Sequence, residues 1–139
     1  MDIEQTKAEI KKEEGFRMET YKCTEGHLTG GYGHKMLDGE TPPTDMAGWT
    51  KLFERDFARA VSGAEELLMI CPNVDDTARH IVVEMCYQMG SYGVSKFHGM
   101  LSALQKSDYV TASKEMLDSR WAKQTPKRAM RMAERMRNI

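Results

Sequence analysis

The stretch EEGFRMETYKCTEGHLTGGYGH, residues 13–34, decides how the rest of the chain is interpreted. An acidic helix end, Glu13-Glu14-Gly15, runs directly into a segment that is dense in glycine. Such glycines predict a backbone that turns tightly beside something it approaches closely. From Phe16 to Leu37, β-forming residues alternate irregularly with glycines, which predicts a small antiparallel ribbon. The role of Cys23 is open: nucleophile, metal ligand, buried filler, or replacement of another residue type.

The segments on either side of this stretch predict helix, loop and helix. Ile3 and Ile10 stand seven residues apart and indicate a short, weakly amphipathic first helix, which Gly15 ends. LDGETPPT, residues 37–44, is expected to be a loop because two prolines and a glycine disfavour regular structure. Thr44 is then expected to cap a long helix that carries an apolar stripe at helical spacing.

The second half of the chain predicts only helices. Residues 75–89 are apolar on nearly every side, which is typical of a helix in the centre of a domain, and Gly90 is expected to end it. Shorter helices are expected around residues 97–106 and 108–118, and a last one begins at Thr125-Pro126. The outline is a small β lobe near the N-terminus followed by a helical lobe.

Composition narrows the class of protein. With 139 residues, 40% hydrophobic and 29% charged, the chain is long enough for one globular domain with a real core. No apolar run reaches the length of a membrane span, and the charged N-terminus lacks the apolar region of a signal peptide, so we expect synthesis in the cytoplasm. Three widely spaced cysteines argue against a disulfide framework.

Charge is distributed unevenly, although the net charge is only −1. From residue 120 to the end, seven basic residues face one acid, Glu134, which gives this segment a net charge of +6. Either a solvated helix face or contact with an anionic surface explains such a segment. Nucleic-acid binding is disfavoured because the rest of the chain is not basic and no recognition motif is present.

Glu14 is the candidate for acid–base chemistry. At the C-terminal end of a helix the macrodipole is negative, so the pKa of a carboxyl group is expected to rise. A carboxylic acid that stays protonated near neutral pH suits a general acid, although most glutamates at helix ends are simply surface residues. Two alternatives use Cys23: a metal site with His27 and His34, which matches no zinc spacing, and a Cys/His nucleophilic pair.

Four separated segments carry a resemblance to a known family. Residues 13–34 resemble the signature of the T-even phage lysozymes, which are endolysins that hydrolyse peptidoglycan. The similarity continues through LFERDFARAV at residues 52–61 and YQMGSYGVSKF at residues 87–97, and it is strong again in SRWAKQTPKRA at residues 119–129. The resemblance therefore covers almost the whole chain.

The resemblance implies an α+β, mainly α, lysozyme-like fold with two lobes and a cleft between them. The chain is then a single domain, residues 1–139, with a β lobe at about 14–43 and a helical part formed by 1–13 and 44–139. Glu14 matches the general acid and Thr29 the residue that helps to hold the attacking water. The further matches are residues of the saccharide groove, Glu25, Leu28, Tyr87, Gln88, Phe97 and Arg120, and supporting residues, Arg128, His34 and Asp56.

The family reaction is hydrolysis of the β-1,4 bond between N-acetylmuramic acid and N-acetylglucosamine, and it implies no metal or organic cofactor. Cys23 departs from the family pattern because it stands where the family has an aspartate. A thiolate could act as base or nucleophile, Thr29 could position water with Glu14 alone, or the site could be impaired. We expect hydrolysis to be retained, because Glu14 and Thr29 remain.

These inferences predict a phage endolysin. It would be a monomer that waits in the host cytoplasm until a holin opens the membrane, and would then reach the periplasm and cell wall of a Gram-negative host. Its partner is peptidoglycan, with peripheral contact of the basic segment with the anionic envelope. Two rival functions are a lytic transglycosylase, which needs only Glu14, and a non-catalytic wall-binding protein.

Overall fold

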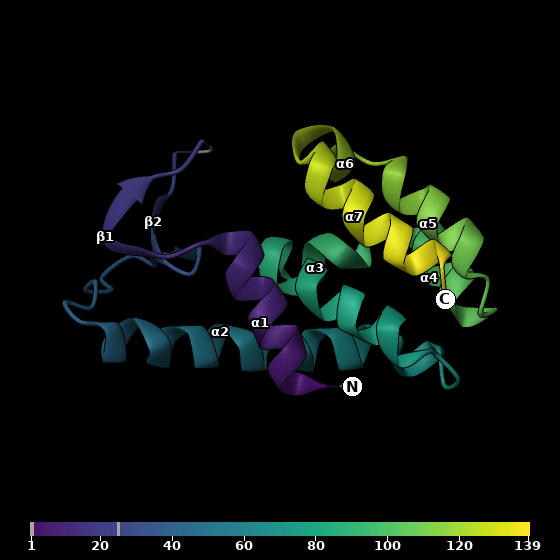
Figure 1. The fold of residues 1–139 in the computed structure, drawn as a ribbon, viewed down its shortest axis with the longest axis horizontal. Coiled ribbons are helices and arrows are strands. Elements are labelled where there is room, and N and C mark those ends of the chain that lie inside the picture. The colour runs from purple at the N-terminus through teal and green to yellow at the C-terminus, as the bar shows by residue number, and fades with distance from the viewer. Residues whose placement is uncertain (1, 25) are drawn as a thin grey trace.

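The computed structural model describes residues 2–24 and 26–139. Helices form most of the structure, and a three-stranded antiparallel sheet of order β1-β2-β3 stands at one end (Figure 1). In chain order the elements are α1 (Ile3–Glu14), β1 (Arg17–Lys22), β2 (Leu28–Gly31), β3 (His34–Lys35), α2 (Met46–Leu67), the short 3₁₀ helix η1 (Leu68–Ile70), α3 (Asp76–Ser95), α4 (His98–Gln105), α5 (Tyr109–Leu117), α6 (Arg120–Gln124) and α7 (Pro126–Arg137).

The sheet packs against α2 through Trp49. A Cβ atom added at Gly30 would lie 2.4 Å from the indole ring, and one added at Gly31 would lie 2.5 Å from it, so both positions need glycine. The indole Nε1 donates a hydrogen bond to the carbonyl oxygen of Met18 in β1 (2.8 Å). The glycines of the quoted stretch therefore serve the attachment of the sheet to the helix.

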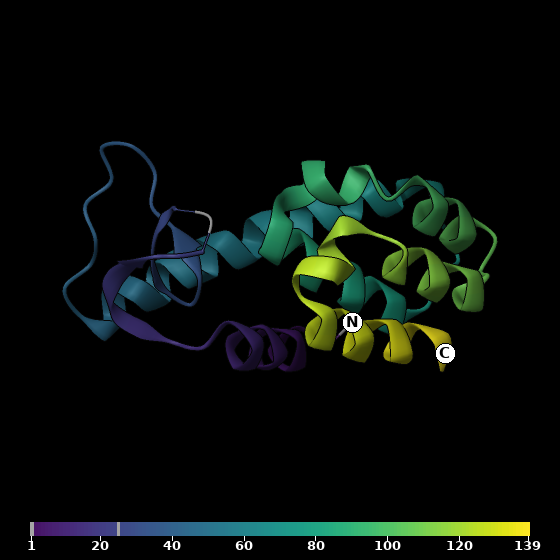
Figure 2. The same ribbon diagram turned by 90° about the horizontal axis from the view of Figure 1, so that it is seen from above.

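Helix α2 connects the two lobes. Figure 1 shows it running from beneath the sheet to the far end of the helical lobe, and Figure 2 shows the sheet and its following loop gathered at one end of it. Its buried side chains recur at helical spacing: Trp49, Phe53, Phe57, Ala60 and Ala64. The predicted N-cap Thr44 is wrong by one residue, because the Asp45 side chain accepts the hydrogen bond from the backbone N–H of Gly48 (2.8 Å).

Helix α3 is the centre of the helical lobe, as its all-round apolar sequence predicted. Residues 81–86 are all buried. Gly90, with φ +80° and ψ 154°, interrupts the helical geometry as expected, but the helix resumes and continues to Ser95. A left-handed φ at this kink favours glycine because it carries no Cβ.

The remaining helices cover α3 on one side. The four helices α4, α5, α6 and α7 gather at the C-terminal end of the molecule (Figures 1 and 2). The predicted α4, α5 and α7 are confirmed, whereas the five-residue α6 was not expected. Thr125 precedes Pro126 as predicted, but its hydroxyl donates to the carbonyl of Trp121 (3.0 Å) and makes no capping hydrogen bond to α7.

The predicted fold class is confirmed: α+β and mainly α, with a small β lobe and a larger helical lobe. One hydrophobic core runs from Ile10 of α1 through α2 and α3 to Met136 of α7. Across residues 2–24 and 26–139, no helix combines the length and the apolar character that crossing a membrane requires.

Candidate active site

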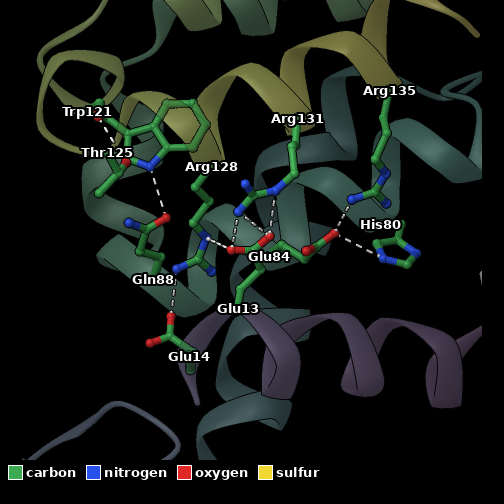
Figure 3. Close-up of polar contacts among 10 residues, drawn as sticks. All are labelled: Glu13, Glu14, His80, Glu84, Gln88, Trp121, Thr125, Arg128, Arg131 and Arg135. Atoms are coloured by element: carbon green, nitrogen blue, oxygen red, sulfur yellow. Dashed lines mark hydrogen bonds and ion pairs between the residues drawn. The ribbon is translucent and has the colours of Figure 1, made fainter.

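Glu14 is the last residue of α1, and its side chain is only 14% exposed. Its Oε1 accepts a hydrogen bond from Nη1 of Arg128 in α7 at 2.9 Å (Figure 3). Burial raises the pKa of the Glu14 carboxyl group, and the nearby Glu13 adds to this, while Arg128 and Lys35 oppose it. The sequence predicted the direction of this pKa shift from the helix macrodipole, but the main physical cause is burial.

The turn between β2 and β3 lies directly on the Glu14 carboxyl group. A Cβ atom added at Gly33 would come within 2.2 Å of Glu14 Oε2, and the φ of Gly33 is +73°. Both the close approach and the left-handed backbone require glycine at this position. The β lobe therefore shields the acid from one side, and Gly33 is a site residue that the sequence analysis did not single out.

The sheet presents Thr29 and Cys23 on one face. Thr29 pairs with both Tyr21 and Lys35, and the backbone N–H of Cys23 continues the ladder by donating to the carbonyl of His27 (2.8 Å). Since directly paired residues and residues two apart share a face, Thr29, Cys23 and Lys35 point the same way. The charge of Lys35 acts on Glu14 and lowers its pKa.

Thr29 and Cys23 differ in their surroundings. Thr29 is 4% exposed, and its Oγ1 donates a hydrogen bond to the carbonyl of His27 (3.1 Å), which leaves the oxygen free to accept. The half-buried Cys23 forms no disulfide and stands at the start of a turn in which Gly26 N–H donates to the Cys23 carbonyl (2.9 Å). The Thr29 hydroxyl oxygen can therefore accept a hydrogen bond from a water molecule.

A cleft of about 1150 Å³ lies between the two lobes. Thr24 and Lys35 line it from the β lobe, and residues of α3 to α6 line it from the helical lobe. Trp121 forms part of the wall: its Nε1 donates to Gln88 Oε1 (2.9 Å), and its ring meets Phe97 edge-on at 6.1 Å. Trp121 is a further site residue that the sequence analysis did not name, although it stands in one of the quoted motifs.

The predicted groove residues divide into two groups. Gln88, Phe97 and Arg120 line the cleft. The Tyr87 hydroxyl instead donates to the carbonyl of Tyr32 (2.6 Å), and Tyr87 borders a smaller pocket of about 310 Å³ on the other side of Gln88.

Two further predicted groove residues stand apart from this lining. Leu28 is exposed at the start of β2 and is not among the residues that line the cleft, and Glu25 falls outside the described residues. The predicted binding roles of Leu28, Glu25 and Tyr87 remain predictions.

His34 joins the β lobe to α2. Its Nδ1 lies 2.6 Å from Asp56 Oδ2, and its Nε2 lies 2.7 Å from Glu40 Oε1. Hydrogen bonding to Asp56 raises the pKa of His34. Burial acts to raise the pKa of Glu40, but hydrogen bonds from His34, the Leu37 backbone and Arg55 hold it at about 2. Sequence patterns could not identify Glu40, because an acid in a proline-containing loop carries no spacing signal.

The basic C-terminal segment is largely neutralised by acids from other elements. Arg128 pairs with Glu14, Arg131 with Glu13 at 2.8 Å, and Arg135 with Glu84 at 2.9 Å (Figure 3). Glu13 and Glu84 thus reduce its net charge from +6 to +4, and Glu14 removes one more positive charge when it is ionised. The sequence count therefore overstated the charge that this face offers to an anionic surface.

In the part of the chain that the structure describes, no three or more His, Cys, Asp or Glu side chains are arranged to hold a metal ion. Cys71 and Cys86 are buried, and neither they nor Cys23 form a disulfide.

Glu14, Thr29 and Cys23 are not among the residues that line this cleft, but Lys35, which pairs with Thr29 and whose charge acts on Glu14, does line it. A glycoside hydrolase needs a carboxylic acid near a cleft that accepts a saccharide. Comparison with known proteins gives the family: the phage lysozyme family matches residues 11–138. The chain therefore belongs to the phage lysozyme family, whose members are glycoside hydrolases that act on peptidoglycan.

Individual relatives agree with this assignment. The chain is 32% identical to a protein of Dictyostelium discoideum described as probable T4-type lysozyme 2, with 88% of each chain aligned. A second protein of that organism, probable T4-type lysozyme 1, is 29% identical over the same shares. The pre-baseplate central spike protein Gp5 of Enterobacteria phage T4 is 31% identical over 88% of this chain and 26% of its own length.

Proposed function

We propose that this chain is a muramidase that cleaves the β-1,4 bond between N-acetylmuramic acid and N-acetylglucosamine, with Glu14 as the general acid. The observation that carries the proposal is the Glu14 carboxyl group, which is mostly buried between Arg128 and the Gly33 turn and has a raised pKa. A carboxyl group that keeps its proton toward neutral pH can protonate the leaving oxygen while positive charge builds on the sugar ring. Arg128 then stabilises the carboxylate that remains.

Thr29 and Cys23 hold the attacking water in this mechanism. The Thr29 hydroxyl donates to the backbone, so its oxygen accepts a hydrogen bond from the water and directs a water lone pair away from the sheet. The Cys23 thiol, on the same face, occupies the position where the family carries a carboxylate. It serves as a weak hydrogen-bonding neighbour of the water rather than as a full base.

A lytic transglycosylase is a second candidate, and the replacement of the family carboxylate by Cys23 favours it. Glu13, which precedes Glu14, accepts two hydrogen bonds from Nη2 of Arg131, each of 2.8 Å. In this reaction the 6-hydroxyl of muramic acid displaces the glycosidic bond without water, and the product carries a 1,6-anhydro end. A hydrolase leaves reducing ends instead.

The first experiment compares Glu14→Gln with Glu13→Gln. The two acids are adjacent, similarly buried and each paired with an arginine of α7, so Glu13→Gln is a matched control. On permeabilised cells we expect Glu14→Gln to lower the rate of turbidity loss by about 10²–10⁴-fold and Glu13→Gln to lower it far less. Full activity of Glu14→Gln would contradict the assignment of the acid.

Mass spectrometry of the released fragments separates the candidate reactions. Reducing muramic ends support hydrolysis, and 1,6-anhydro ends identify a transglycosylase. Binding to purified peptidoglycan without any released fragment identifies a wall-binding protein.

The biological role that we propose is that of an endolysin. The protein would act as a monomer, remain in the host cytoplasm during infection, and reach the wall once a holin opens the inner membrane. Membership of a phage lysozyme family supports this role. Expression in a Gram-negative bacterium should leave cells intact until the inner membrane is permeabilised, and lysis should then follow quickly; equally fast lysis without permeabilisation would contradict the role.

A further inference from the structure

Three arginines lie on one face of α7 at i, i+3 and i+7: Arg128, Arg131 and Arg135 (Figure 3). The first two reach the acids at the end of α1, with Arg128 on Glu14 at 2.9 Å and Arg131 on Glu13 at 2.8 Å. The third, Arg135, instead reaches Glu84 of α3 at 2.9 Å. One helix face therefore contacts both the catalytic acid and a carboxylate in the centre of the helical lobe.

Glu84 is a buried charge that depends on its partners. Its side chain is 1% exposed. Burial acts to raise its pKa, but His80 and Arg135 more than compensate, so the pKa of Glu84 is lowered and the carboxyl group stays ionised. A buried carboxylate without such partners is strongly unfavourable, so the contact between α3 and α7 is required for this part of the fold.

His80 extends this contact to α1. Its Nε2 lies 3.0 Å from Glu84 Oε2, and its Nδ1 lies 3.1 Å from the hydroxyl of Thr6 in α1. The Thr6 hydroxyl also donates to the carbonyl of Asp2 (2.8 Å), which connects this contact to the start of α1. Thr6, His80, Glu84 and Arg135 thus form a chain of contacts from α1 through α3 to α7.

Arg128 makes one hydrogen bond to Glu14 and one longer ion pair, from Nε to Glu13 Oε2 at 3.9 Å. Of its three guanidinium nitrogens, only Nη1 has a hydrogen-bond partner among the described residues, while Nε and Nη2 are buried without one. Its position therefore depends on where α7 lies. Arg128 and Arg135 are seven residues apart on the same helix, about 10 Å along its axis, so a shift at Arg135 moves Arg128 as well.

We propose that Arg135, Glu84 and His80 are positioning residues for the catalytic acid: they fix α7 and α1 on α3 in the register that places Arg128 on Glu14. This inference rests on the proposed role of Glu14 as general acid. Three charged groups act on Glu14 itself: Arg128 from α7, Glu13 from α1 and Lys35 from β3. Arg128 lies on α7, and Glu13 is paired with Arg131 of the same helix at 2.8 Å, so both depend on the position of α7; of the two, Arg128 has the larger effect on the pKa of Glu14.

Glu84→Gln tests the proposal because it keeps the side-chain shape and removes the charge. Arg128 lowers the pKa of Glu14, so a looser Arg128 should raise it further and shift the alkaline limb of kcat/KM against pH upward by on the order of half a pH unit. KM should stay unchanged. Glu65→Gln is the control, since it breaks a 2.8 Å pair with Arg79 between α2 and α3, away from α7.

A direct titration of Glu14 by carboxyl NMR, without substrate, makes the result independent of catalysis. We expect the same upward shift in Glu84→Gln and none in Glu65→Gln. If Glu84→Gln does not fold, the double variant Glu84→Met with Arg135→Met removes the contact while filling the space, and the same shift is expected. Arg135→Lys keeps the positive charge beside Glu84, so Glu14 in this variant should titrate nearly as it does in wild type.

Two outcomes separate a failure of the positioning role from a failure of the general-acid role of Glu14. An unmoved Glu14 titration in a folded Glu84 variant overturns the positioning role. A Glu14 titration that moves while the pH–rate profile stays fixed supports the positioning role and overturns Glu14 as the general acid.

Discussion

At the scale of single residues, Thr29 and Cys23 share a sheet face but differ in what they can do for a water molecule. Thr29 is buried and fixed by its hydrogen bond to the His27 carbonyl, so its oxygen is a well-placed acceptor. A thiol is only a weak donor and a weak acceptor. We therefore assign the orientation of the water mainly to Thr29 and a secondary contribution to Cys23.

Substitutions at these two positions test that order. Thr29→Val keeps the shape and removes the acceptor, and we expect kcat to fall by about 10–100-fold, the value of one hydrogen bond in the reaction. Cys23→Ser keeps a donor and an acceptor of similar size and should stay within about threefold of wild type. Steady-state kinetics on solubilised peptidoglycan gives both numbers. A silent Thr29→Val together with an inactive Cys23→Ser would show that the thiol performs chemistry.

Roles could be predicted for residues that stand in a sequence motif. They could not be predicted for residues whose role depends on contacts between distant parts of the chain. Glu14 was predicted to be the acid from its motif and its helix end, and that role stays a prediction. Its contact with Arg128 joins residues 114 positions apart, so the geometry of that pair follows only from the packing of α7 against α1. Glu40 and Gly33 had no distinguishing pattern, because a loop acid and one glycine among several look ordinary until the chain is folded.

At the scale of elements, the local sequence predicted which segments form helices and strands. It predicted less well the residues at which those elements begin and end. Gly15 ends α1 and the glycine-rich ribbon forms a sheet, because both depend on residues next to one another. The start of α2 was misplaced because Thr44 and Asp45 are both good caps, and only Asp45 accepts from Gly48. The continuation of α3 past Gly90 escaped prediction, since a left-handed glycine usually ends a helix.

At the scale of the whole molecule, the His34 cluster connects the β lobe to the helix that carries both lobes. His34 contacts Asp56 of α2 and Glu40 of the intervening loop, and Glu40 in turn accepts from Arg55 of α2 at 2.9 Å. The attachment of the β lobe thus combines this charged cluster with the packing of Trp49 on the sheet glycines. Because the cluster titrates, the stability of the whole protein should depend on pH.

The sign of that dependence follows from the shifted pKa values. His34 has a pKa above its usual 6.5, so its stabilisation is complete below about pH 6.5 and is lost as the pH rises through the folded-state pKa. Glu40 has a pKa of about 2 instead of 4.5, so its stabilisation is complete above about pH 4.5 and is lost as the pH falls toward 2. The cluster should therefore stabilise most between about pH 4.5 and 6.5.

Thermal unfolding of wild type and His34→Asn across pH tests this dependence. At pH 5.5 the variant loses buried hydrogen bonds to two carboxylates, and we expect a stability loss of about 1–3 kcal/mol, or roughly 4–12 °C in Tm. The difference in Tm should narrow as the pH rises well above 7, because wild-type His34 then loses its own charge. His98→Asn, at an exposed histidine at the start of α4, is the control and should follow wild type at every pH. A difference between His34→Asn and wild type that stays constant from pH 5 to 9 would mean that the cluster contributes through shape alone and that its charge does not hold the β lobe to α2.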